Sequence, residues 1–169
     1  MRGFQQLYPC HIFLLVNTTA TQSVWAMASP PAFTGQCFCG AITYYVSQEK
    51  PDRAYVCHCI DCRQSSGTSY AHNVMFDGKC LTINDPHGCL SIFGNTDDGS
   101  KRFCGRCGSP LFLTTPSRIE EMREKVLVCV GTIDGGETNK ALSPVAEGWG
   151  KRREQWLPQL KGAEQFEEW

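Results

Sequence analysis

Residues 35–40 read GQCFCG, and residues 103–108 read FCGRCG. Each stretch holds two cysteines with glycines beside them. Glycine allows the backbone to turn back beneath a metal, often at positive φ, so that backbone amides can point at the sulfur atoms. Two such turns supply the four thiolates of a tetrahedral structural zinc site. We therefore predict one structural zinc ion, which ties the fold together through Cys37, Cys39, Cys104 and Cys107.

The alternative for these two turns is a pair of redox-active dithiols. A disulfide within Cys-X-Cys closes a small and strained ring. No thioredoxin-like βαβ pattern surrounds either pair of cysteines. The sequence therefore favours zinc over redox chemistry at these four positions.

A second cysteine cluster lies between the two turns. Residues 56–67 read VCHCIDCRQSSG, which places Cys57, Cys59 and Cys62 close together with no fourth cysteine in the motif. A zinc ion with three protein ligands and one open position is typical of a catalytic site. His58 is a possible fourth ligand, but in an extended segment it points away from its neighbours Cys57 and Cys59. We predict a second, catalytic zinc on the three cysteines.

This ligand set limits the chemistry of the second site. Three thiolates leave a zinc site with a net charge of about −1, so the metal activates water poorly compared with a zinc held by neutral histidines. A thiol that binds at the open position is still readily deprotonated. We expect a thiolate that adds to an electrophile. The basic residues that could bind the carboxylates of a peptide thiol, or be ordinary surface charges, are Arg63, Lys101, Arg102 and Arg106.

The composition is that of one domain with a core of its own. The chain has 169 residues, of which 41% are hydrophobic, and a net charge of −1. This charge argues against a nucleic-acid partner, and no apolar run reaches the ~20 residues of a membrane span. Eleven cysteines, mostly in tight clusters, favour metal ligation in a reducing, cytoplasmic location. No sequence pattern specifies an oligomeric state.

The cysteines outside the clusters, which we expect to be core or surface residues, are Cys10, Cys80, Cys89 and Cys129.

The first 32 residues differ from the rest in that they contain no acidic residue and a single arginine. They are interpreted as an N-terminal extension, either disordered or a leader, and the zinc-binding domain is expected at residues 33–169. A secretory signal, a mitochondrial presequence and an initiation at Met27 all remain open for this segment.

Short apolar runs separated by Gly, Pro, Asn and Asp predict an all-β fold of twisted antiparallel sheets. The one helical segment that we expect is a surface turn within residues 117–125. The expected strands are 41–46, 69–76, 80–83, 89–93, 110–115 and 126–133.

The order of these motifs resembles a known family. GQCFCGAITY, CHCIDCRQSSG and FCGRCGSPLF, followed by a late tryptophan in GWGKRREQW, are similar to the glutathione-dependent formaldehyde-activating enzyme and centromere protein V family. The resemblance runs from about Phe33 to about Phe166. It implies a β-tent fold with the two zinc sites predicted above. It also implies the formation of S-hydroxymethylglutathione from formaldehyde and glutathione, a carbon–sulfur lyase activity.

Two hypotheses of function follow from the sequence. In the first, the chain is an enzyme that joins a thiol, glutathione above all, to a small aldehyde such as formaldehyde, or catalyses the reverse reaction. The reaction takes place at the zinc on Cys57, Cys59 and Cys62, and Arg63 binds the thiol. In the second, the chain is a non-catalytic zinc scaffold that binds a partner, as the centromere protein branch suggests. The near-neutral charge weighs against chromatin binding and so favours the enzyme.

Overall fold

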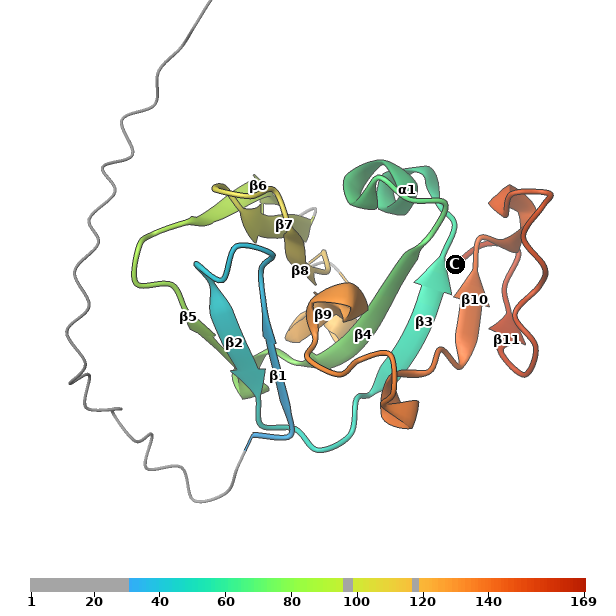
Figure 1. The fold of residues 1–169 in the computed structure, drawn as a ribbon. Coiled ribbons are helices and arrows are strands. Elements are labelled where there is room, and N and C mark those ends of the chain that lie inside the picture. Colours follow the sequence, from blue (N-terminus) through green and yellow to red (C-terminus); the bar gives the residue numbers. More distant parts are fainter. Residues whose placement is uncertain (1–30, 96–98, 117–118) are drawn as a thin grey trace, which may run out of the picture.

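The fold consists of two β-sheets that pack around a shared core (Figure 1). The structure is a computed structural model, and it describes residues 31–95, 99–116 and 119–169. Residues 1–30, which make up most of the expected extension and include Cys10 and Met27, lie outside the described residues. None of the helices in the described ranges has the length and apolar character that a membrane crossing requires.

The smaller sheet has the strand order β1-β2-β5, and all of its pairs are antiparallel. Its strands are β1 (Phe33–Gln36), β2 (Thr43–Val46) and β5 (Leu81–Asn84). β1 alternates strictly between buried and exposed residues, which is the pattern of a strand with one face on the core.

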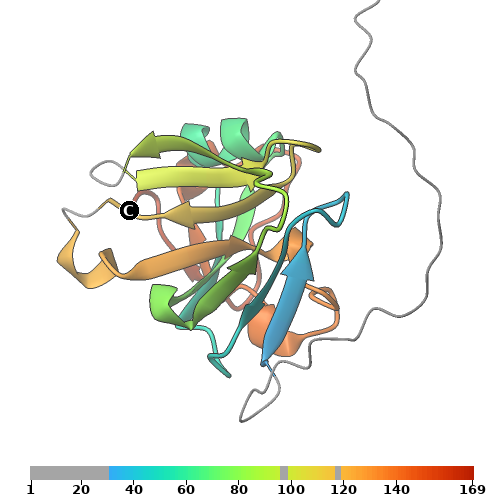
Figure 2. The same cartoon turned by 90° about the vertical axis from the view of Figure 1, so that its left-hand side faces the viewer.

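The larger sheet has eight strands in the order β11-β10-β3-β4-β9-β8-β7-β6. Figure 2 shows that the strands of the two sheets run in different directions, because β6 and β7 of the larger sheet run across the view whereas β1 of the smaller sheet is steep. The strands are β3 (Arg53–Cys57), β4 (Ala71–Asp77), β6 (Leu90–Asn95), β7 (Gly99–Cys104), β8 (Pro110–Thr114), β9 (Lys125–Cys129), β10 (Ala146–Gly148) and β11 (Glu164–Gln165).

The structure confirms the all-β fold of antiparallel sheets, with one difference at an edge. β10 runs parallel to both β3 and β11. The six expected strands correspond to β2, β4, β5, β6, β8 and β9, with ends that shift by up to four residues. The expected strand at 126–133 is shorter than predicted because Val130–Thr132 turn into a 3₁₀ helix.

Helical structure is short in the described part of the chain. The α-helix α1 (Ile60–Ser66) was not predicted. The surface turn that was expected within residues 117–125 is a 3₁₀ turn at Glu120–Met122. Residues 117 and 118 lie outside the described ranges. The other 3₁₀ turns are Gly78–Cys80, Lys140–Leu142 and Gly150–Arg152.

The larger sheet buries residues on both faces. Val74, Phe76 and Val128 point into the main core between the sheets, where Tyr44 of β2 packs edge-on against Phe112 at a ring distance of 4.9 Å. Side chains alternate along a strand, so the intervening positions lie on the opposite face. Tyr55, Cys57 and Leu127 form a second apolar cluster there. The second cysteine cluster belongs to this opposite face.

Gly35 is required where β1 approaches the 3₁₀ turn at Val130–Thr132. A Cβ at this position would overlap the Tyr44 ring and the Thr132 carbonyl oxygen. We expect Gly35→Ala to destabilise the fold by about 1–3 kcal/mol, because overpacking at a rigid contact forces the backbone to shift. Thermal unfolding measures this change. In the control variant Gly131→Ala, a Cβ meets no atom within 4 Å, so its melting temperature should stay close to that of the wild type. Equal melting temperatures for the two variants would contradict the close packing of β1.

Candidate metal centres

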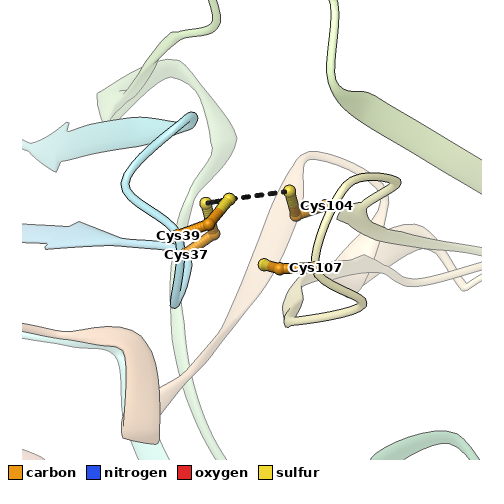
Figure 3. A group of neighbouring side chains, drawn as sticks. All are labelled: Cys37, Cys39, Cys104 and Cys107. Atoms are coloured by element: carbon orange, nitrogen blue, oxygen red, sulfur yellow. Dashed lines mark hydrogen bonds between the residues drawn. The ribbon is translucent and has the colours of Figure 1, made fainter. Parts of the chain in front are cut away.

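Four of the predicted ligands lie together at one point between the sheets. Cys37 and Cys39 are in the turn that joins β1 to β2, Cys104 is the last residue of β7, and Cys107 is in the turn that joins β7 to β8 (Figure 3). Their sulfur atoms all lie within 4.8 Å of one another. The Sγ atoms of Cys37 and Cys39 are 3.6 Å apart, and those of Cys39 and Cys104 are 3.8 Å apart. Tetrahedral zinc–thiolate bonds of about 2.3 Å place sulfurs about 3.8 Å apart, so the residues present fit a four-thiolate metal.

The backbone of both turns supports this arrangement. Gly40 and Gly108 have φ values of 70° and 79°, and each donates its N–H to the carbonyl of the first cysteine in its turn. The Ile42 N–H donates to Cys37 Sγ at 3.3 Å. A hydrogen bond with Ser109 lowers the pKa of Cys107 to about 6. The pKa of Cys37 is lowered too, whereas burial raises the pKa of Cys104 to about 12. Without a metal, thiolate is therefore favoured at Cys37 and Cys107, and a bound cation would favour it at all four cysteines.

The three-cysteine cluster forms where β3 ends and α1 begins. Cys57 is the last residue of β3, Cys59 is the N-cap of α1, and Cys62 is in the first turn of the helix. The Cys62 N–H donates to Cys59 Sγ at 3.3 Å, and the three sulfurs lie within 4.8 Å of one another. The helix ends after one further turn because Gly67 adopts φ 67° at its C-cap. The local fold therefore brings all three sulfurs to one point.

The three thiols differ in acidity. The hydrogen bond with Cys62 lowers the pKa of Cys57 to about 6. The same bond raises the pKa of Cys62, and burial raises that of Cys59. Without a metal, one proton is therefore lost readily and two are held. A bound cation would favour the loss of all three protons, so metal binding here should release protons.

His58 is not among the three clustered ligands. Its Nε2 atom lies 2.9 Å from Glu147 Oε1, and both side chains are 2% exposed. Glu147 also accepts a hydrogen bond from the Leu160 N–H at 2.8 Å and lies 3.2 Å from Arg153 Nη1. Burial opposes the charged form of Glu147, but these contacts lower its pKa overall. The prediction that His58 faces away agrees with this geometry, and the His58–Glu147 pair ties the turn that holds Cys57 and Cys59 to the C-terminal segment.

Aromatic residues of the C-terminal segment cover one side of this cluster. Trp149 and Phe166 pack against the same apolar group as Cys59 and Cys62. The Trp169 ring lies edge-on to Tyr55 at 5.3 Å and directly over Gly148. Trp149 has a φ of 57°, which is uncommon for a residue other than glycine. The late tryptophan that the sequence analysis noted therefore belongs to the surroundings of the three cysteines.

The basic residues named from the sequence lie in different places. Arg63 of α1 forms an ion pair with Glu154, and both side chains are about one-third exposed. Lys101 donates to the Asp61 carbonyl at 3.4 Å, so its side chain reaches α1. Arg106 is exposed in the turn of the four-cysteine cluster. A carboxylate that binds Arg63 must therefore compete with Glu154.

Cys80, Cys89 and Cys129, the single cysteines that the structure describes, take no part in either cluster. Cys80 and Cys89 are partly buried against the main core. Burial raises the pKa of Cys129 to about 12, so its thiol is protonated at neutral pH. All of the cysteines in the described ranges are free of disulfides.

Comparison with known proteins places the chain in a family. Residues 32–152 match the family described as "Glutathione-dependent formaldehyde-activating enzyme". The chain therefore belongs to this family, and the resemblance inferred from the cysteine motifs is confirmed.

Two individual proteins are similar to the chain. A Halomonas elongata protein named "Putative glutathione-dependent formaldehyde-activating enzyme" is 33% identical over 90 residues, which are 48% of this chain and 55% of that protein. The chain thus spans about half the length of this curated relative. A crystal structure of a Rhodobacter sphaeroides protein is similar with a TM-score of 0.49 and 22% identity, over 60% of this chain and 88% of that one.

The two clusters should differ in what they do for stability. We expect Cys104→Ser to unfold or aggregate the chain, because binding of a structural zinc contributes on the order of 10 kcal/mol to such folds. Thermal unfolding and elemental analysis measure the outcome. Cys80→Ser is the matched control, because Cys80 is partly buried but lies in neither cluster. A soluble Cys104→Ser variant with an unchanged melting temperature and metal content would rule out the structural role.

Proposed function

We propose that the three-cysteine cluster binds a zinc ion at which a thiol, most directly glutathione, is joined to a small aldehyde such as formaldehyde. The four-cysteine cluster binds a second, structural zinc ion. In this proposal the chain is a carbon–sulfur lyase that acts in a reducing compartment such as the cytoplasm. Membership of the family and the free state of the described cysteines support it.

The observation on which the proposal depends is the number of sulfurs in the second cluster. Three sulfur atoms lie within 4.8 Å of one another, and no histidine or carboxylate of the described residues joins them. Three thiolates do not complete a tetrahedron, whereas a thiol substrate supplies a fourth sulfur. When bound, the zinc ion supplies a positive charge that lowers the pKa of a thiol at its open position. Cys57, Cys59 and Cys62 are thus the catalytic metal ligands.

The reaction needs no oxidant and no reductant. The thiol loses its proton, its sulfur forms a bond to the aldehyde carbon, and the carbon–oxygen π bond breaks. The proton ends on the former carbonyl oxygen, so the product is a hemithioacetal such as S-hydroxymethylglutathione. The protein orients the reacting sulfur and keeps water away through the apolar residues around the cluster, which include Tyr55, Leu127 and Trp149.

Other residues hold the catalytic turn in place. The backbone N–H of His58 donates to the Gly148 carbonyl at 3.0 Å, and the imidazole ring of His58 pairs with the Glu147 carboxylate. Both interactions fix the segment between Cys57 and Cys59. Arg63 releases the Glu154 carboxylate and binds the carboxylate of the thiol in its place. This is the role that the sequence analysis assigned to this arginine.

The proposal predicts that folding and activity separate in a Cys59→Ser variant. Exchange NMR can follow formaldehyde hydrate and glutathione as they interconvert with S-hydroxymethylglutathione. We expect the wild type and the Cys80→Ser control to accelerate the exchange, and Cys59→Ser to lose this acceleration while its melting temperature falls only slightly. The reason is that Cys59 belongs to the cluster on the opposite face from the main core.

Two outcomes would contradict parts of this account. If the wild type accelerates no exchange across a panel of small thiols and aldehydes, yet binds two zinc ions and unfolds cooperatively, the non-catalytic scaffold replaces the enzyme. If Arg63→Ala leaves the dependence of the rate on thiol concentration unchanged, Arg63 does not bind the thiol.

A further inference from the structure

The indole of Trp169 lies beside the side chain of Cys57. Gly148 of β10 is the parallel register partner of Cys57, so side chains at these two positions point to the same face, about 4.8 Å apart. A Cβ at Gly148 would overlap Trp169 Cε2, the ring carbon that is bonded to Nε1. The indole therefore occupies the place of the missing side chain. The edge of the ring that carries the N–H lies at this place, next to Cys57.

Neighbouring side chains hold this ring in position. Tyr55, two residues before Cys57 on the same strand, lies edge-on to the Trp169 ring. The ring centre of Phe166 is 5.0 Å from that of Trp169. The Arg53 guanidinium lies over both rings, at 5.4 Å from the centre of Phe166 and 5.8 Å from that of Trp169. Contacts on several sides fix the direction of the indole N–H.

The acidity of Cys57 reflects the same contact. The hydrogen bond with Cys62 is the largest cause of its lowered pKa, and a hydrogen bond with the Trp169 side chain lowers this pKa further. An indole N–H is a donor only, so the bond runs from Trp169 Nε1 to the Cys57 sulfur. The Trp169 side chain is 49% exposed, so its substitution leaves the main core intact.

Family membership does not account for this contact. The residues that match the family are 32–152, and Trp169 lies beyond them. The contact therefore belongs to the C-terminal segment of this particular chain.

An N–H donor changes the chemistry of the sulfur that accepts it. The donor draws electron density from a thiolate, and a thiolate that is less basic is also less nucleophilic. Three thiolates around a zinc ion leave a charge of about −1, and a fourth thiolate makes it about −2. A hydrogen bond to one ligand offsets part of this excess charge.

We propose that Trp169 donates its indole N–H to the Cys57 sulfur and thereby lowers the reactivity of this metal ligand toward electrophiles. Trp169 is a positioning residue, because it acts through Cys57. That the electrophile in question is the aldehyde substrate rests on the proposed function. In that reaction the incoming thiolate competes with the protein's own thiolates for the aldehyde, and the indole N–H favours the incoming one.

The test is the rate at which iodoacetamide alkylates each cysteine of the zinc-loaded protein. The sulfur forms a bond to the methylene carbon of the reagent, and iodide leaves. Mass spectrometry at low conversion gives separate rates for Cys57, Cys59 and Cys62. Trp169→Phe keeps an aromatic ring and removes the N–H. We expect the Cys57 rate to rise by about fivefold or more, with no comparable rise at Cys59 or Cys62.

A second variant reaches the same contact by another route. Gly148→Ala keeps the indole but displaces it, because the new Cβ would overlap the ring. It should also raise the rate at Cys57. The controls are Gly131→Ala, whose Cβ meets no atom within 4 Å, and Trp156→Phe, which removes an indole that is 71% exposed. Neither control should change the rate. Rates are compared among variants that keep the melting temperature and zinc content of the wild type.

A spectrum separates the hydrogen bond from mere shielding by the ring. With Co²⁺ in place of zinc, the thiolate-to-cobalt charge-transfer absorption depends on the energy of the sulfur lone pairs, which a donor stabilises. We expect this absorption to move to longer wavelength in Trp169→Phe and to stay in place in Trp156→Phe. Better access of a reagent to Cys57 would not move it.

Three results would overturn the proposal. They are equal Cys57 rates in the wild type and Trp169→Phe, an equal rise in Trp156→Phe, and a charge-transfer absorption that Trp169→Phe does not move. None of them depends on catalysis. If Trp169 lowers the reactivity of Cys57 in a protein that accelerates no thiol exchange, the proposed reaction fails and this inference stands. If the exchange is accelerated but the Cys57 rates are equal, this inference alone fails.

Discussion

The contact between the β1–β2 turn and the β7–β8 turn is the constraint on which the fold depends. Cys39 and Cys104 are 65 positions apart in the sequence, yet their sulfurs lie 3.8 Å apart. One turn belongs to the smaller sheet and the other to the larger one, so a metal at this point would cross-link both sheets. Closing a long loop costs conformational entropy, which the ligand bonds would offset. The main core between the sheets then packs around a fixed junction.

The alternation of side chains along the strands separates this junction from the second cluster. Val74 and Val128 face the main core, whereas their neighbours Asn73 and Cys129 line a cavity of about 450 Å³ on the opposite face. Cys57 lies on that opposite face too, at the end of β3. A change in the second cluster therefore leaves the contacts between the sheets in place. The larger sheet thus contributes cysteines to two separate clusters.

The sequence predicted the cysteine grouping and the strand-rich fold because both depend on local patterns. Glycines flank the turns that hold Cys37, Cys39, Cys104 and Cys107, and apolar runs alternate with turn residues. It did not predict β3 or β7, in which charged or tyrosine residues interrupt the apolar pattern, nor α1, whose seven residues are too few to display a helical period. The parallel pairing of β10 with β3 also escaped prediction, because it joins segments about 90 residues apart.

The cavity could not be predicted for a similar reason. Asn73 is a single polar residue within a strand, and nothing local to it indicates that both of its amide atoms lack a partner. Its neighbours in the cavity come from α1, β4, β7, β8 and β9. Only the register of the sheet brings them together.

The central claim, a four-thiolate site beside a three-thiolate site, is tested most directly by X-ray absorption at the zinc edge. We predict about 3.5 sulfurs per zinc for the purified protein and about 4 after glutathione is added, with no change on adding S-methylglutathione. A value that stays at about 3.5 with saturating glutathione, or one that is already about 4 without it, would contradict the account.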